Sequence, residues 1–530
     1  ARTFAMDLQG TSFIGADRGI GGAGESRAVN PASGEELDPV YQAEGEDTVE
    51  TACQLAAEAF IEFREKSGED KAAFLRTIAD EIDAVEDDIV ARMTEETALP
   101  EGRCRMEKGR TCFQLRLFAD LLGEGSWVDA RIDHADPDRA PVPKPDCRSM
   151  WRPLGPVVVF CASNFPLAYS VAGGDTASAL ASGCPVIIKA HGSHPGTAEI
   201  VATAVRAAVE KCGMPAGVFS LLYGSGRTIG QALVKHPAIK AVGFTGSRAG
   251  GRALMDTAAA RPEPIPVWAE MSAINPVFVL PGALRERGEE IAGGFVGSLT
   301  LGVGQFCTNP GLVISGTEGR DEFAGRIASL ASEVAPATML HKGIATAYHG
   351  AVEAMTSRGG VESLARVEVD SGGSEAGAVV LGTSAESFLA DQTMADEMFG
   401  PATLMVGAGD EEAMLAVAES LEGQLTATVH ATGEDLEAFG KLIAVLERKA
   451  GRLVYNGYPT GVEVCHGMVH GGPAPATSDG RSTSVGPRAI TRFTRLVCWQ
   501  DFPDNLLPEE LKEKNPLGIS RIVDGTRIES

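Results

Sequence analysis

The sequence predicts an α/β protein, in which strands and helices alternate along much of the chain. Three observations support this fold class. Between residues 151 and 276, short apolar runs alternate with helical stretches, as in a parallel sheet covered by helices. The apolar runs are continuous, which is typical of strands buried on both faces. Glycine, 63 of 530 residues, gathers at the strand–helix junctions of this region, where small residues let backbone approach a ligand.

The first 130 residues or so are predicted to be mainly helical. Apolar residues spaced three or four apart indicate one buried helix face from about residue 49 and a second over about 70–86. The stretch from Asp47 to Glu50 has the form of a capping box and predicts the start of the first helix. The apolar positions are Val49, Cys53, Ala56, Phe60 and Phe63, then Phe74, Ile78, Ile82 and Val85.

A connector rich in Asp and Pro, from Asp133 to Pro145, is expected to be extended. After it, strands are expected at 157–161, 186–189, 218–223, 241–245 and 267–271, with helices at 168–182, 197–212, 229–234 and 250–260. A second α/β pattern runs from about 277 to 475. Residues 467–486 read as a Gly-rich loop of the kind that lines a site, and 491–499 as a strand.

Charge and cysteine usage exclude several classes of protein. The net charge is −26 with no basic run, which argues against nucleic acid or an anionic membrane as partner. No apolar run approaches the ~20 residues of a membrane span, and residues 1–11 show no secretory signal. Ten cysteines without a CxxC pair favour reduced thiols, no metal site and a cytoplasmic location.

Two glycine-containing junctions could hold a dinucleotide. Gly224 to Gly230 follows a strand and opens a helix, although its spacing misses the dinucleotide fingerprint and a plain turn explains it as well. Gly246 to Gly251 repeats the arrangement at the next strand, where N–H groups at a helix start suit a phosphate. Together the two loops favour a dinucleotide crevice.

Cys307 and Glu270 are candidates for catalysis. Cys307 lies in a loop between Gly and polar residues, which exposes a thiol, although a structural cysteine is an equal alternative for this residue alone. A cysteine nucleophile needs a thiolate, favoured by N–H groups or a base. Glu270 ends a predicted strand and could be that base, whereas a solvated carboxylate is the simpler alternative.

Six short segments stand in an order that is specific to one family. They are ASNFP (162–166), VIIKAHGSHPGTAE (186–199), FTGSRAGG (244–251), EMSAINP (270–276), GQFCTNPG (304–311) and EMFGPA (397–402). Over nearly the whole chain the sequence resembles the NAD(P)-dependent aldehyde dehydrogenase superfamily. Residues 95–103, 214–224 and 456–473 resemble its branch of NADP-dependent fatty-aldehyde and 2,5-dioxovalerate (α-ketoglutaric semialdehyde) dehydrogenases.

The resemblance implies a covalent mechanism. Cys307 would attack the aldehyde to form a thiohemiacetal, whose oxyanion is held by the Asn164 amide and the N–H of Cys307. Hydride transfer to the nicotinamide would leave a thioester, and Glu270 would activate water to hydrolyse it. His470 would lie near the nucleophile, although a hydrogen bond that orders its loop is the alternative role.

The resemblance also implies the cofactor site. Lys189 would hold the adenosine ribose and Glu397 the nicotinamide ribose, and the remaining candidates are Gly192, Ser193, Arg227, Gly246, Ser247, Gly251 and Phe399. NAD-preferring relatives often carry Glu where this chain has Gly192. Loss of that anion, with Arg227 as a phosphate partner, favours NADP, while NAD use stays open. Ser272 and Ala273 also replace two glycines that are common in the family.

The expected substrate is a small aldehyde, 2,5-dioxovalerate, which would be oxidised to 2-oxoglutarate. The alternatives are a long-chain fatty aldehyde, a CoA-acylating reaction or, remotely, an inactive structural relative. Low aromatic content, 6%, disfavours a long apolar tunnel. Arg481 is a candidate for binding the substrate carboxylate, although a loop ion pair is its more common role.

The resemblance implies three structural parts. These are an NAD(P)-binding domain of residues 1–130 and 152–276, a catalytic domain of 277–475, and a small β oligomerisation arm of 131–151 and 488–515. Exposed edge strands are hazardous unless they are paired, and the family pairs them between subunits. A homodimer or homotetramer is therefore expected, with sedimentation of the purified protein as the measurement.

Overall fold

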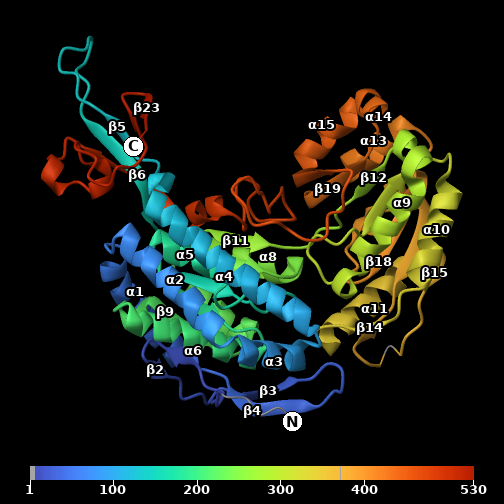
Figure 1. The fold of residues 1–530 in the computed structure, drawn as a ribbon, viewed down its shortest axis with the longest axis horizontal. Coiled ribbons are helices and arrows are strands. Elements are labelled where there is room, and N and C mark those ends of the chain that lie inside the picture. The colour runs from blue at the N-terminus through green and yellow to red at the C-terminus, as the bar shows by residue number, and fades with distance from the viewer. Residues whose placement is uncertain (1–5, 371, 530) are drawn as a thin grey trace.

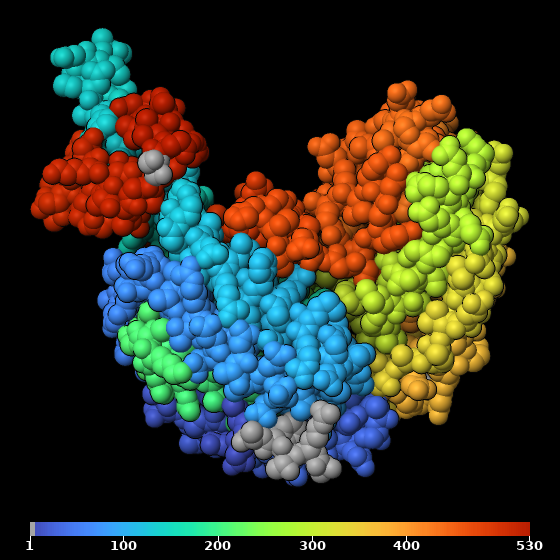
Figure 2. All heavy atoms as spheres, in the orientation of Figure 1, coloured from blue at the N-terminus to red at the C-terminus, as the bar shows by residue number. Residues whose placement is uncertain are grey.

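The computed structural model describes residues 6–370 and 372–529. Figure 1 shows two α/β lobes side by side and a β arm that projects from the first lobe, carrying the C-terminus. Figure 2 shows a hollow between the arm and the second lobe, with the segment before residue 490 at its floor. No helix among the described residues combines the length and the apolar character needed to cross a membrane.

The first lobe is built on a seven-stranded sheet in the order β11-β10-β7-β8-β9-β1-β2, in which β7 to β11 are parallel. The chain runs outward from β7 to β9 and then returns to place β10 on the other side of β7. Ligands of open α/β sheets bind where the strand order reverses in this way. The strands are β1 Phe13–Ile14, β2 Asp17–Arg18, β7 Val157–Phe160, β8 Val186–Lys189, β9 Phe219–Leu222, β10 Ala241–Thr245 and β11 Val267–Glu270.

Helices cover both faces of this sheet, so its strands are buried, as their continuous apolar runs predict. A separate hairpin, β3 Glu25–Val29 with β4 Glu36–Gln42, lies at the edge of the lobe. The helices are α1 Glu46–Phe63, α2 Gly68–Ala84, α3 Glu86–Thr97, α4 Glu101–Glu124, α5 Gly174–Ser182, α6 Pro195–Lys211, α7 Gln231–Lys235 and α8 Arg248–Ala259.

The second lobe has a sheet in the order β15-β17-β18-β13-β12-β19-β20, parallel except at β15. Its strands are β12 Val277–Val279, β13 Leu312–Ser315, β15 Glu362–Arg366, β17 Val379–Ser384, β18 Ala402–Gly407, β19 Gln424–His430 and β20 Ala450–Tyr455, and β14 Ala337–Thr338 pairs with β16 Glu375–Ala376. Its helices are α9 Pro281–Thr300, α10 Arg320–Ser332, α11 Lys342–Thr356, α12 Ala385–Ala390, α13 Glu411–Ser420, α14 Gly433–Ala438 and α15 Gly440–Lys449. The α/β fold class is thereby confirmed in both lobes.

The arm is a five-stranded sheet in the order β21-β6-β5-β22-β23. The connector predicted to be extended forms the turn between β5 and β6, closed by a bridge between Asp136 and Lys144. The predicted subunit contact through this arm stays a prediction. The strands are β5 Arg131–Asp133, β6 Cys147–Pro153, β21 Thr494–Gln500, β22 Arg521–Val523 and β23 Thr526–Ile528.

Two local expectations were wrong. The helix expected from 168 begins only at Gly174, because the chain first makes tight turns in which Gly174 N–H donates to the carbonyl of Ala168. The expected capping box at Asp47 is absent, since α1 begins at Glu46 after Gly45, whose side chain cannot cap. Asp47 instead lies in the first turn, where a negative charge complements the helix dipole.

Candidate functional site

Cys307 lies in a tightly held loop at the junction of the two lobes. The loop is reached through Val303, a β-branched residue at φ +58°, and Gly304 at φ +65°. A Cβ at Gly304 would lie 2.3 Å from the backbone of Gly400, so only glycine fits this approach. Strained backbone of this kind commonly persists where surrounding contacts fix a functional group.

The buried side chain of Asn275 holds the loop from the other side. Its Nδ2 donates to the carbonyl oxygens of Cys307, at 2.9 Å, and Asn309, at 3.0 Å. Its Oδ1 accepts from Thr426 of β19, and Gln424 accepts the N–H of Asn275 itself. The nucleophile candidate is therefore fixed to β19 of the second lobe.

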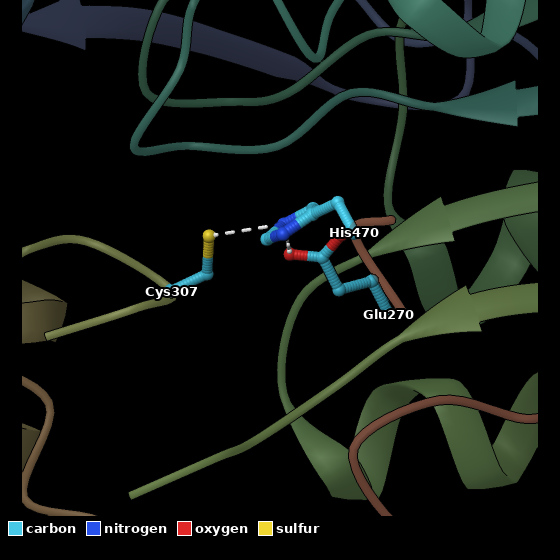
Figure 3. Close-up of side chains that lie close together, drawn as sticks. All are labelled: Glu270, Cys307 and His470. Carbon is cyan, nitrogen blue, oxygen red and sulfur yellow. Dashed lines mark hydrogen bonds and ion pairs between the residues drawn. The ribbon is translucent and has the colours of Figure 1, made fainter. Parts of the chain in front are cut away.

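Glu270, at the end of β11, and His470, from the Gly-rich loop, meet at Cys307 (Figure 3). The Nε2 of His470 lies 2.8 Å from Oε1 of Glu270 and 3.4 Å from the Sγ of Cys307. Ser484 donates to the other carboxylate oxygen at 3.0 Å. Because an ionised carboxylate can only accept, Nε2 carries the proton in the Glu270 contact. Three side chains that the sequence placed far apart are thus in one hydrogen-bonded group.

The loop that carries His470 is tied to β11. His470 N–H donates to Thr483, and its carbonyl accepts the N–H of Ser484. Glu270 itself bridges to Thr477. Gly472, at φ +150°, lies so close to the carbonyl of Gln424 that a Cβ would sit 2.1 Å from it. The loop therefore has a definite path, and His470 is only 1% exposed.

The electrostatics of the group favour an anionic Glu270 and a protonated Cys307. Burial would raise the pKa of Glu270, but the neighbouring His470 and hydrogen bonds from His470, Cys307 and Ser484 outweigh it and lower that pKa. Burial and the Glu270 carboxylate raise the pKa of the Cys307 thiol well above its usual value. In the free protein the group is thus an ionised Glu270 beside a protonated Cys307 thiol.

Asn164 lies beside the nucleophile loop, where its Nδ2 donates to the carbonyl of Gln305 at 3.1 Å. The amide carries a second N–H, and the backbone N–H of Cys307 makes no hydrogen bond with the residues that the structure describes. Two donors thus flank Cys307, as oxyanion stabilisation requires.

A small cavity lies behind Glu270. Its volume is about 20 Å³, and its walls include Glu270, His470, Thr477 and Ser484. A cavity needs roughly 10–15 Å³ to hold one water molecule. One water therefore fits against the carboxylate, with hydroxyl groups available to hold it.

The predicted cofactor residues gather at the carboxyl end of the first sheet. Ser247 caps α8 and accepts from Gly250, which leaves the N–H groups of Arg248 and Ala249 without a backbone partner within the described ranges. The Nζ of Lys189 donates to the carbonyl of Ala190, and burial lowers the pKa of this amine. A helix start and a lysine at a strand-order reversal suit the phosphates and ribose of a dinucleotide.

The glycines at this edge serve two purposes. A Cβ at Gly192 or Gly226 would meet nothing within 4 Å, so these positions face open space. By contrast, a Cβ at Gly246 would lie 2.8 Å from the ring of Phe244, and one at Gly251 would lie 2.7 Å from Met271. The latter glycines allow the helix to pack closely on the sheet, a role that the sequence did not separate from ligand approach.

Gly192, Ser193 and Arg227, three of the predicted cofactor residues, differ in their contacts. No carboxylate stands at position 192, and Ser193 is hydrogen-bonded to His191. Arg227 is exposed, and no ion pair among residues 6–370 and 372–529 includes it.

Glu397 and Phe399 lie in the second lobe, facing the first. Glu397 borders a groove of about 540 Å³ that also reaches Arg248 at the start of α8. Burial raises the pKa of Glu397 to about 7, against hydrogen bonds from Ser272 and the N–H of Ala273 that lower it. The serine that replaces a family glycine thus positions this carboxylate. Phe399 lines a small adjoining cavity.

Arg481 lies apart from this group. Its side chain is 90% exposed and pairs with Asp479 two residues earlier. This contact matches the loop ion pair that was the alternative role for Arg481. The sequence reasoning missed the contacts of Asn275 and Ser484, because single polar residues on a strand or loop carry no distinguishing pattern.

Comparisons with known proteins agree with the geometry. Residues 21–496 match the model of the "Aldehyde dehydrogenase family". The chain is 54% identical over 523 residues to "Alpha-ketoglutaric semialdehyde dehydrogenase 2" of Azospirillum brasilense, covering 98% of this chain and 99% of the relative. It is 42% identical over 525 residues to the "Alpha-ketoglutaric semialdehyde dehydrogenase" of Acinetobacter baylyi, covering 97% and 98%. The fold is similar to that of an E. coli NADP-dependent enzyme (TM-score 0.79, 21% identity, 93% and 98% covered).

Proposed function

Because the chain belongs to the aldehyde dehydrogenase family, we propose that it oxidises α-ketoglutaric semialdehyde (2,5-dioxovalerate) to 2-oxoglutarate. The substrate is supported by two relatives, 54% and 42% identical over nearly their full lengths, that carry this activity in their names. The observation that carries the chemistry is the Cys307–His470–Glu270 group beside two free N–H donors.

In the proposed reaction, Cys307 is the nucleophile. Its thiol gives the proton to the adjacent Glu270 carboxylate as sulfur attacks the aldehyde carbon, and the Asn164 amide and the Cys307 N–H stabilise the oxyanion. Each such donor typically contributes about 2.7–4 kcal/mol of transition-state stabilisation. When bound, NAD(P) supplies the oxidising power by accepting hydride from the substrate carbon.

After Glu270 has released the thiol proton to solvent, its carboxylate also serves the second half of the reaction. The acyl group that Cys307 then carries as a thioester must be hydrolysed, and water near pH 7 needs a base. His470 and Ser484 hold this carboxylate by hydrogen bonds, so we propose that they position the base rather than react.

The comparison of two aldehydes tests the substrate. We expect kcat/KM for 2,5-dioxovalerate to exceed that for a long-chain aldehyde such as dodecanal at least tenfold, measured from NADPH absorbance. A missing carboxylate leaves buried donors unpaired, which typically costs about 1–3 kcal/mol. A large preference for dodecanal would contradict the proposal and favour the fatty-aldehyde alternative.

We further propose that NADP is preferred over NAD, with Lys189 and Glu397 toward the two riboses and Ser193 and Arg227 toward the 2′-phosphate. We expect Arg227→Ala to lower kcat/KM with NADP about 10- to 100-fold and to change kcat/KM with NAD little, as for loss of a charge-assisted pair of about 1.5–3 kcal/mol. Arg252→Ala, which removes an exposed arginine paired with Asp256 on α8, is the matched control. Equal kcat/KM for NADP and NAD in the unmodified protein would refute this preference.

A further inference from the structure

Two arginines lie beside the nucleophile without any acidic partner. Arg110 belongs to α4 and Arg452 to β20, and neither takes part in an ion pair within the described part of the chain. In a protein of net charge −26, where arginines such as Arg116 and Arg105 are paired with carboxylates, two half-buried guanidinium groups without a carboxylate partner need an explanation. A charge that is withdrawn from water without a partner lowers the stability of the protein, unless a ligand supplies the opposite charge.

The position of Arg110 follows from how α4 is fastened. One turn earlier on the helix, Glu107 accepts the N–H groups of Leu167 and Ala168, which follow Asn164. Arg110 itself donates through Nη1 to the carbonyl of Val462. Its guanidinium therefore lies between the segment after Asn164 and the loop around residue 462. Both segments flank Cys307, through Asn164 on one side and His470 on the other.

One edge of the Arg110 guanidinium has no hydrogen-bond partner among the described residues. Its Nη1 is occupied by Val462, while its Nε is buried without a hydrogen-bond partner and Nη2 makes no hydrogen bond to any described residue. The Nε–Nη2 edge is the one that binds a carboxylate with two parallel hydrogen bonds. Arg452 differs, because its Nη1 and Nη2 already donate to the carbonyls of Gly461 and Pro459.

The surroundings of this edge suit a short anion with an apolar chain. Phe165 and Phe306, the neighbours of Asn164 and Cys307, make an edge-to-face contact with 5.5 Å between ring centres, within an apolar group that includes Val462. The hydroxyl of Tyr169 is also buried there without a partner. The positive charges of Arg110 and Arg452 act on Cys307, where each lowers the pKa of the thiol against the larger effect of burial.

We propose that Arg110 binds the carboxylate of the aldehyde substrate through its free Nε–Nη2 edge, with Arg452 as an adjacent positive charge. This inference rests on the proposed function and names the group that selects its substrate. In 2,5-dioxovalerate the carboxylate carbon lies about 5 Å from the aldehyde carbon when extended. The anchor must therefore stand beside Cys307, as Arg110 does, and not on the surface, as Arg481 does.

The test compares two aldehydes in Arg110→Gln. Glutamine keeps a polar chain but removes the charge and the fork. We expect kcat/KM for 2,5-dioxovalerate to fall about 10- to 100-fold, mostly through KM, as for loss of a charge-assisted pair. For pentanal, which has the same carbon number and no carboxylate, we expect a change below about threefold. Pentanal turnover also reports that the variant is folded.

Arg116→Gln is the matched control, since it removes an arginine of the same helix that is paired with Asp80 and Asp83. It should leave the ratio of the two kcat/KM values unchanged. A readout independent of turnover is calorimetric binding of 2-oxoglutarate, the product, which Arg110→Gln should weaken by a similar factor.

The outcomes separate this inference from the proposed function. If the unmodified protein does not prefer 2,5-dioxovalerate over pentanal, the proposed substrate is wrong. If it does, and Arg110→Gln keeps that preference, the substrate stands and the role of Arg110 is refuted. Loss of the preference in Arg452→Gln but not in Arg110→Gln would likewise overturn the assignment. An equal loss for both aldehydes in Arg110→Gln would mean a structural role.

Discussion

Replacing Cys307 by serine should abolish aldehyde oxidation, with kcat/KM reduced at least about a thousandfold and no initial burst of NADPH. The alcohol proton is far less acidic than the thiol, and an alkoxide at neutral pH is out of reach of a neighbouring carboxylate. The substitution changes one atom in a loop fixed by Asn275, so the fold and the position of Glu270 should be kept. Stopped-flow absorbance of NADPH at equimolar enzyme and substrate is the measurement.

The matched control is Cys465→Ser, because this cysteine lies exposed in the same Gly-rich region as His470 and should tolerate the change. Alkylation adds a pH test. Burial and Glu270 raise the pKa of Cys307, so its thiolate forms only as pH rises, and carboxamidomethylation should keep accelerating above pH 9. Full NADPH production by Cys307→Ser would instead show that another group is the nucleophile.

The sheet strands are the part of the fold that the sequence predicted best. Strands at 186–189 and 241–245 agree with β8 and β10 to the residue, because a strand buried on both faces must be apolar throughout its length. Helix starts were less predictable. The helix expected at 168 begins at Gly174, since the chain first makes tight turns, in which Gly173 N–H donates to Ser170 and Gly174 N–H to Ala168.

Some residues of the candidate site could also be predicted from the sequence, whereas others could not. Cys307, Glu270 and Asn164 stand in family motifs, so their proximity was expected from the resemblance. The direct contact of His470 with Glu270 depends on the path of a 20-residue loop, which composition cannot predict. Nothing in the sequence singled out Arg110, because an arginine on an amphipathic helix is usually solvated. Its place near the site becomes visible only from its hydrogen bond to Val462, 352 residues away.

The glycine excess shows why composition alone is ambiguous. Gly192 and Gly226 face open space at the cofactor edge, as a ligand-contact role requires. Gly230 and Gly251 instead make room for Phe160 and Met271 of the protein itself, since a Cβ would lie 2.8 and 2.7 Å from these side chains. Glycines at neighbouring strand–helix junctions therefore serve either ligand approach or internal packing. Only the three-dimensional structure shows which of the two roles each glycine has.

Glu270→Gln should separate the two halves of the proposed reaction. Glutamine can still accept from His470, so the loop should keep its path, but the base is lost. We expect the steady-state kcat to fall about 10²- to 10⁴-fold, the range for removal of a general base. The thioester should accumulate, giving a burst of one NADPH per subunit. Glu263→Gln, at an exposed carboxylate paired with Lys240 before β11, is the control.

The amplitude and the rate of that burst report on two different roles of the Glu270 carboxylate. Its amplitude depends on slow hydrolysis of the thioester, whereas its rate depends on removal of the Cys307 proton, to which Glu270 is also adjacent. A full but slowed burst, restored in rate as pH rises and the thiol ionises without help, would mean that Glu270 serves both steps. If no burst were seen at any pH, Glu270 would be needed only for the steps that form the thioester. That result would contradict its role in hydrolysis. Unchanged kcat would require a different base, and His470, 3.4 Å from the sulfur, would then be the group to replace.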